Sequence, residues 1–181
     1  LRASQVALTG PQLTLVMAKD GQVELPAGTF GFDGTTLAAD HLNVEDARLI
    51  LIHAASGARY VLDKLWFRGD VRSLAGSFRG EGAFVAGAEL FGYRVSAARQ
   101  SGGGIKTRFN LDRTAHALSI EGDGVVAWEA GTPKFEGAVT FSRAVGTVLA
   151  GGRAVALEPW RLTSRVVAQP AGLSEAVRRA S

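Results

Sequence analysis

The sequence contains no cysteine, which excludes a disulfide framework and a thiolate metal site. Proline is scarce, at 5 residues, and no apolar run approaches the roughly 18 to 20 residues that span a bilayer. The chain begins at Leu1, without a basic and apolar leader segment. We therefore expect a piece of a longer protein, whose membrane anchor would lie outside this segment.

An excess of one charge is also lacking. Lysine and arginine number 20 and aspartate and glutamate 17, and the basic residues are scattered along the chain. A nucleic-acid surface needs a basic stripe interleaved with exposed aromatic residues. Here aromatic and charged residues alternate, so they face opposite sides of a strand. We expect no nucleic-acid partner.

Glycine is abundant, at 23 residues, and hydrophobic residues make up 46% of the 181-residue chain. Glycine without a collagen period and with little proline suits tight turns and strands that other groups approach closely. A chain of this length is expected to form one domain. The composition predicts a single all-β domain, or a fragment of a longer β structure, over residues 1–181.

The segment from Ser77 to Arg99 predicts a β-hairpin with one sensible register. Gly87-Ala88 is taken as a two-residue turn of the type that favours glycine first. One face then pairs aromatic with aromatic or glycine, and the other pairs opposite charges, which are stabilising cross-strand partners. The predicted pairs are Phe84 with Phe91, Gly82 with Tyr93, Gly80 with Val95, Phe78 with Ala97, Glu81 with Arg94, and Arg79 with Ser96.

Two more hairpins are predicted after this one. Loops at 113–116 and 130–133 would join three strands, and the glycine-rich join near 99–103 would place Val95 beside Phe109. Together these strands predict a five-stranded antiparallel meander over 78–142. The predicted pairs are Phe109 with Ile120, Arg108 with Glu121, Lys106 with Asp123, Trp128 with Phe135, Glu129 with Lys134, and Phe141 over Gly122.

The first part of the chain, 1–67, also predicts hairpins. Asp20-Gly21 is a strong turn signal between Leu13–Met17 and Val23–Leu25. Leu42–His53 and Ala58–Phe67 would pair across a four-residue loop. Both faces of that hairpin carry apolar residues, so we expect it to be deeply buried.

The end of the chain predicts three further features. Residues 146–153 form a small-residue turn region of undefined structure. Residues 160–168 alternate apolar and polar side chains, which predicts a strand. Residues 171–180 predict a short C-terminal helix, with Pro170 near its start and two arginines in its last turn.

Catalytic motifs are weak in this sequence. Residues 122–127 match a dinucleotide fingerprint, but no helix follows to hold a pyrophosphate. His41, His53 and His116 lie beside predicted turns at no metal-ligand spacing. Four carboxylates lie on the predicted polar face: Glu81, Glu121, Asp123 and Glu136. Three of them have a predicted basic partner. We expect no enzyme activity and no cofactor, although a hydrolase or sugar-binding domain using those carboxylates is a weaker alternative.

A meander with one apolar face must cover that face or bind something with it. The first third of the chain could form a second sheet and complete a sandwich. The strands could close into a barrel. The sheet could instead curve strongly into an open β-groove whose interior holds a flexible apolar ligand. Aromatic residues over glycines favour bending, and thus the last two options.

Several segments resemble the AsmA family, a group of Gram-negative envelope proteins that includes TamB-like relatives. The likeness covers about residues 37–170. It rests on Leu42–Leu49 (LNVEDARL), the Ser56-Gly57 turn, Val61–Leu65 (VLDKL), Leu74–Phe84 (LAGSFRGEGAF), Phe135–Phe141 (FEGAVTF) and Pro159–Leu162 (PWRL).

The resemblance implies a periplasmic β-groove, tethered to the inner membrane in the full-length protein. It also implies a role in phospholipid transport or outer-membrane biogenesis, with lipid acyl chains and envelope proteins as partners. The main alternative is a structural or protein-interaction β-domain with a closed core. The residues expected to line the groove are Phe78, Phe84, Phe91, Tyr93, Val95, Phe109, Trp128, Phe135 and Phe141.

Overall fold

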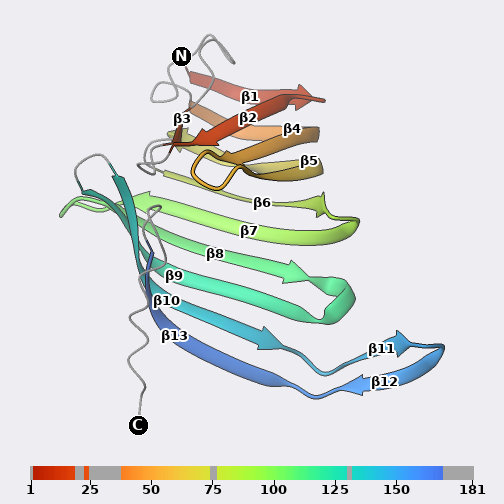
Figure 1. Cartoon of the computed structure of the whole chain (residues 1–181). Coiled ribbons are helices and arrows are strands. Elements are labelled where there is room, and N and C mark those ends of the chain that lie inside the picture. The colour runs from red at the N-terminus through yellow and green to blue at the C-terminus, as the bar shows by residue number, and fades with distance from the viewer. Residues whose placement is uncertain (1, 19–22, 25–37, 74–76, 130–131, 169–181) are drawn as a thin grey trace.

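The computed structural model of the chain describes residues 2–18, 23–24, 38–73, 77–129 and 132–168. These residues are all-β and form one large, mostly antiparallel sheet of 11 strands, lying side by side as a single layer (Figure 1). A two-stranded hairpin, β11 (Gly146–Ala150) and β12 (Arg153–Leu157), stands apart from it. The strands of the large sheet are β1 (Arg2–Thr9), β2 (Gln12–Met17), β3 (Val23–Glu24), β4 (Ala38–His53), β5 (Ala58–Ser73), β6 (Ser77–Ala86), β7 (Glu89–Arg99), β8 (Ile105–Arg113), β9 (Leu118–Glu129), β10 (Thr132–Arg143) and β13 (Trp160–Ala168).

Strands β6 to β10 each pair with the next in the chain, and they occupy the region where the sequence predicts a five-stranded meander. The predicted β6–β7 register is confirmed: Phe84 lies opposite Phe91 and Gly82 opposite Tyr93. The turn type differs from the prediction. Gly87 and Ala88 both have positive φ, at 57° and 70°. Such a pair defines a type I′ turn, which matches the right-handed twist of the flanking strands.

The predicted registers of the next two hairpins are wrong by two residues. Phe109 lies opposite Gly122 rather than Ile120, because β8 continues through Arg113 and the turn falls at 114–117. Phe135 lies opposite Val126 rather than Trp128, because β10 already begins at Thr132. A shift of two residues keeps every side chain on its predicted face. Between β7 and β8, the expected placement of Val95 beside Phe109 is confirmed.

The N-terminal strands join the same sheet instead of forming a second one. The predicted hairpins β2–β3 and β4–β5 are both observed, with Leu51 opposite Tyr60 in the second. β1 and β2 lie one after the other along β4, and both run parallel to it. Gly10, with φ of 65°, separates them, and its amide donates to the Glu45 carbonyl at 2.8 Å. The described residues therefore do not form the two-sheet sandwich that was considered from the sequence.

The sheet is open and is not strongly curled, so the predicted strong curvature is wrong. From β6 to β13 every register runs without a shift, whereas bulges bend sheets. Register shifts are confined to β4, β5 and β6, where Asp46 and Lys64 have positive φ. Aromatic rings lie over glycines as expected, but the strong bending expected from this arrangement does not follow.

The deep burial predicted for the β4–β5 hairpin is also wrong. Ile50, Ile52 and Val61 are half-buried, and Tyr60 is 59% exposed. In the described part of the chain no second layer covers either face of this hairpin (Figure 1). Apolar residues on both faces of a strand do not by themselves bury it.

Toward the end of the chain, β13 occupies 160–168 and pairs with β10. The region predicted as an undefined turn is the β11–β12 hairpin, which extends beyond the ends of β10 and β13 (Figure 1). The helix predicted at 171–180 lies outside the described residues. Within them the one helical segment is a 3₁₀ turn, η1 (Thr114–His116), and no helix is long and apolar enough to cross a membrane.

Candidate functional site

One face of the sheet is apolar from β5 to β13. Residues opposite one another in neighbouring strands share a face, and the observed registers place all nine predicted groove residues on the same side. We call this side the apolar face. Its large apolar side chains include Leu62, Phe67, Val71, Phe78, Phe84, Phe91, Tyr93, Val95, Ile105, Phe109, Leu111, Leu118, Ile120, Val126, Trp128, Phe135, Val139, Phe141, Trp160, Leu162 and Val166.

Aromatic rings on the apolar face lie over glycines of adjacent strands. A Cβ atom on Gly82 would come within 2.5 Å of the Tyr93 ring, and one on Gly124 within 2.7 Å of the Phe135 ring. The Phe109 ring occupies the corresponding space above Gly122. The prediction that Tyr93 covers Gly82 is confirmed, whereas the prediction that Phe141 covers Gly122 is wrong, because the register differs by two residues. The rings thus fill the space left by the missing side chains.

The aromatic residues meet in two groups. Phe84 and Phe91 are stacked, with ring centroids 5.4 Å apart and planes 15° apart, and Tyr93 lies 5.9 Å from Phe84. Phe109 and Phe135 form the second group at 6.2 Å. Such contacts stabilise by about 0.5–1.5 kcal/mol beyond the area that they bury. The predicted aromatic pair across the β6–β7 hairpin is therefore a real ring contact.

The apolar face has no cover within the described residues. The buried hydrophobic side chains of the described residues, on both faces, are all alanine or valine: Ala39, Ala47, Val71, Ala83, Ala97 and Val139. In contrast, Trp128 is 55% exposed and Phe141 39% exposed. A closed β-domain would bury its aromatic residues most deeply. On this face the other predicted aromatic residues are half-buried, and none of the nine is fully buried.

Tyr93 is the one polar group among the nine predicted residues. Its hydroxyl donates a hydrogen bond to the Trp66 carbonyl oxygen at 3.1 Å, two strands away. Burial of the hydroxyl raises the pKa of Tyr93 from 10.0 to about 12. The neutral phenol is thus the form that the folded sheet accommodates.

Phe67 belongs to the apolar face but was not among the predicted residues. Its ring lies over both Gly69 and Gly80, which face each other across β5 and β6. The signal was present in the sequence, because Phe67 precedes Gly69 by two residues and so shares its face. The β5–β6 pairing was needed to see it. Leu162 and Val166 on β13 were missed for the same reason, since the partner of that strand was not assigned.

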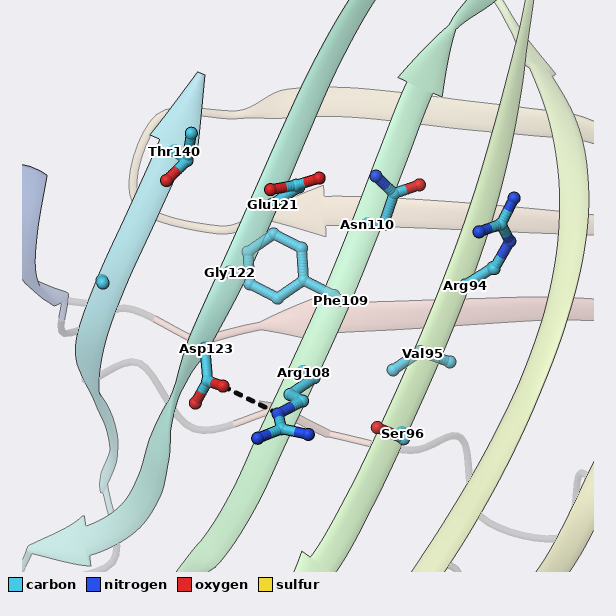
Figure 2. A pocket seen from close by; sticks show the side chains of 11 residues that line it. Arg94, Val95, Ser96, Arg108, Phe109, Asn110, Glu121, Gly122, Asp123 and Thr140 are labelled. Atoms are coloured by element: carbon cyan, nitrogen blue, oxygen red, sulfur yellow. Dashed lines mark hydrogen bonds and ion pairs between the residues drawn. The ribbon is translucent and has the colours of Figure 1, made fainter. Parts of the chain in front are cut away.

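The opposite face carries cross-strand ion pairs (Figure 2). Arg108 donates to Asp123 at 2.7 Å. Lys106 also contacts Asp123, but it lies opposite Val125 and not, as predicted, opposite Asp123. Arg108 therefore pairs with Asp123 and not with Glu121, which instead accepts from Arg161 at 3.3 Å. Hydrogen bonds from Lys106 and Arg108 lower the pKa of Asp123 below its usual value.

An open depression of about 430 Å³ lies among these polar side chains. Figure 2 shows Arg94, Asn110 and Glu121 in one row across three strands, with Arg108 and Asp123 in the next row. Asp123 is neutralised by its two basic neighbours, and Glu121 by Arg161. Hydrogen bonds from Lys106 and Arg108 lower the pKa of Asp123, whereas a general acid needs a raised pKa. Asp123 therefore does not have the raised pKa of a general acid.

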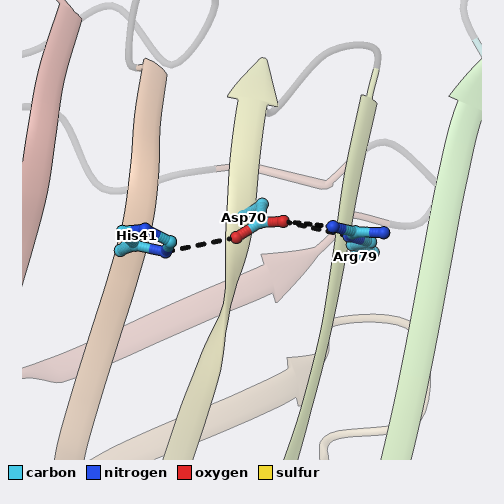
Figure 3. A network of polar contacts seen from close by, with 3 residues as sticks. All are labelled: His41, Asp70 and Arg79. Carbon is cyan, nitrogen blue, oxygen red and sulfur yellow. Dashed lines mark hydrogen bonds and ion pairs between the residues drawn. The ribbon is translucent and has the colours of Figure 1, made fainter.

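A second polar cluster joins β4, β5 and β6 (Figure 3). Asp70 lies between Arg79, at 2.8 Å, and His41, at 3.4 Å. The hydrogen bond from Arg79, with a smaller effect of His41, lowers the pKa of the Asp70 carboxyl. His53 contacts Ser56 at 2.6 Å and His116 contacts Glu89 at 3.8 Å, so the three histidines are far apart in the fold.

Residues 122–127, which match a dinucleotide fingerprint, lie inside strand β9, so they open no helix. In the described residues no group of three or more histidine, aspartate or glutamate side chains is placed to hold a metal ion. The apolar face is therefore the candidate site. Comparisons of the chain with protein-family models, with curated proteins and with solved structures found no match.

Proposed function

We propose that this chain is a non-enzymatic segment of an AsmA-like envelope protein, and that its apolar face shields lipid acyl chains. The single observation that carries the proposal is the uncovered aromatic surface. In the full-length protein the segment would lie in the periplasm, tethered to the inner membrane. Its role would be phospholipid transport or outer-membrane biogenesis.

The size of the apolar face indicates a binding surface and not an incidental exposure of apolar residues. Seven neighbouring strands, β5 to β10 and β13, span six spacings of about 4.8 Å, and nine residues of β13 extend about 3.3 Å each. The face is thus roughly 29 Å by 30 Å. Large exposed apolar patches on a monomer usually mark a binding surface. Something apolar is needed to cover this face.

The chemistry of the face suits an acyl chain better than a polar ligand. Most of its side chains are aliphatic or aromatic. The hydroxyls of Tyr93, Thr107 and Ser164 already donate to backbone carbonyls. Rings that fill glycine positions leave few projections between strands. A flexible hydrocarbon requires no directional partner and gains from area alone. The sheet would act as an open groove wall on which such chains slide.

The direct test is lipid capture by the chain itself. We expect native mass spectrometry and organic extraction of the purified protein to give stoichiometric phospholipid or fatty acid. We also expect a fluorescent fatty acid to bind and to be displaced by unlabelled oleate. Failure of both measurements on folded protein would contradict the proposal. If the folded protein bound no lipid but formed a stable complex with another protein, the structural, protein-interaction alternative would be favoured instead.

Two tryptophans supply a matched pair of variants. Trp128 lies on the apolar face and is 55% exposed, whereas Trp66 lies on the opposite face and is 39% exposed. Removing an exposed side chain costs little fold stability. We expect Trp128→Gln to weaken fatty-acid binding several-fold and Trp66→Gln to leave it unchanged. Equal effects of the two substitutions would show that the apolar face is not the binding surface.

A further inference from the structure

The edge strand β13 has features of a strand that pairs with another chain. It is nine residues long, contains no proline, and pairs with β10 without any register shift. No described strand pairs with its outer edge, so that edge presents a row of backbone donors and acceptors. Figure 1 shows β13 at the boundary of the sheet.

The opposite boundary of the sheet is protected in ways that β13 is not. There the edge is divided among β1, β2 and β3, of 8, 6 and 2 residues. Gly10-Pro11 interrupts it between β1 and β2, and proline cannot donate to a further strand. Short pieces and proline are common means of preventing edge pairing. The two boundaries therefore differ in how open they are to an added strand.

The charges along the β13 edge favour an acidic partner strand. On the polar face, one row of residues facing each other across strands contains Asp70, Arg79, Arg108 and Asp123 and ends at Arg165. Within the row, the carboxylates bind basic neighbours at 2.7–2.9 Å. Arg165 faces Ala138 and has no acidic partner among the described residues. The row ends with an unmatched positive charge at the edge.

Arg161 adds a second positive charge on the same strand and face, four residues earlier, with Thr163 between them. It reaches diagonally to Glu121 at 3.3 Å, and its side chain is 66% exposed. In the antiparallel register that sets Arg161 opposite Arg165, a second copy of β13 would bring like charges directly opposite each other, which is unfavourable. The β1 strand of another copy, RASQVALT, offers no carboxylate. The charge pattern thus disfavours self-association.

We propose that the outer edge of β13 binds a β-strand of another polypeptide, one that alternates apolar residues with residues including two acidic ones four positions apart. Main-chain hydrogen bonds would supply affinity. Acidic side chains opposite Arg161 and Arg165 would set the register. The apolar side chains of the added strand would extend the apolar face beyond Leu162 and Val166. This interaction is independent of whether that face binds lipid.

The test uses a fluorescent peptide, Thr-Val-Glu-Val-Thr-Val-Glu-Val-Thr, which presents its glutamates four positions apart in either strand direction. The matched control has lysine in place of both glutamates. We expect the acidic peptide to bind about tenfold more tightly in fluorescence anisotropy, from two favourable pairs in place of two like-charge pairs. We also expect it to slow hydrogen exchange of the amides of β13 and not of β1.

A charge reversal separates recognition from general attraction. Arg165→Glu should abolish or invert the preference between the two peptides, whereas Arg59→Glu, the same change at an exposed site on β5, should leave it intact. Both variants should keep the circular dichroism of the parent. The proposal is overturned if neither peptide protects β13, if both bind equally, or if Arg59→Glu has the same effect as Arg165→Glu.

Discussion

The ring of Phe109 occupies the space that a Cβ atom on Gly122 would need, across the boundary between β8 and β9. An alanine at residue 122 must therefore displace the ring or the strand. We expect Gly122→Ala to lower the free energy of unfolding by about 1–3 kcal/mol, the usual cost of overpacking. Urea unfolding followed by circular dichroism measures this loss.

Gly92 is the matched control for that substitution. It lies in β7 with no atom within 4 Å of its Cβ position, and it has no positive φ. Alanine there should be neutral or slightly stabilising, because glycine is the more flexible residue in the unfolded chain. Similar losses for Gly92→Ala and Gly122→Ala would refute the close approach of Phe109.

The turn between β6 and β7 holds a strained residue. Ala88 has a φ of 70°, a left-handed conformation that costs a residue with a side chain roughly 1–2 kcal/mol. We expect Ala88→Gly to stabilise the protein by up to about 1 kcal/mol, since the glycine also loses more entropy on folding. Ala98→Gly, in the exposed part of β7, should change stability in the opposite direction. The melting temperature of Ala88→Gly should therefore lie above that of the parent, and that of Ala98→Gly below it.

Tyr93 should titrate unusually late. The chain has two tyrosines, so Tyr60→Phe leaves Tyr93 as the single phenol. Absorbance at about 295 nm should then show a midpoint near 12 in the folded protein, because burial raises the pKa of Tyr93 from 10.0 to about 12. A group with a raised folded pKa adds stability that is complete below pH 10 and is lost as the pH rises toward 12. A midpoint near 10 before any unfolding would contradict the burial of this hydroxyl.

Acid should weaken the polar face at Asp123. Hydrogen bonds from Lys106 and Arg108 lower the pKa of this carboxyl below its usual 3.8. Its contribution is therefore complete above that value and is lost as the pH falls through the folded pKa. We expect Asp123→Asn to lose stability at neutral pH but to lose less than the parent on further acidification below pH 4, as measured by urea unfolding. The difference should shrink in 1 M NaCl, which screens exposed pairs; a difference unaffected by salt would argue against ion pairing.

The sequence predicted the face of each strand more reliably than its partner. The β6–β7 register was correct because a two-residue turn leaves one way to pair the flanking strands. The β8–β9 and β9–β10 registers were not, since alternation with a period of two looks the same after a shift of two residues. Turn details decided them: Ala117 adopts a φ of 52° and joins the loop, and Thr132 joins β10.

The cover of the apolar face could not be predicted from pattern either. Apolar residues such as Leu49, Leu51 and Leu62 look alike in a buried strand and in an uncovered one, because their burial depends on what packs above them. The bend expected from glycines failed for a related reason. Gly82 and Gly124 do lie under Tyr93 and Phe135, but each ring fills the space of the missing side chain, and no register shift occurs from β6 to β13.

The parallel docking of β1 and β2 on β4 has a kinetic consequence. Each hairpin from β4 to β10 pairs neighbours in sequence, whereas Arg2 meets Ala38 and Gln12 meets Arg48. Loops of that length close late, because their entropy must be lost before any contact forms. We expect pulsed hydrogen exchange during refolding to protect β6 and β7 first and residues 2–17 last; simultaneous protection would contradict this order. The N-terminal edge would then be the part of the sheet added to a template that the rest of the chain has already built.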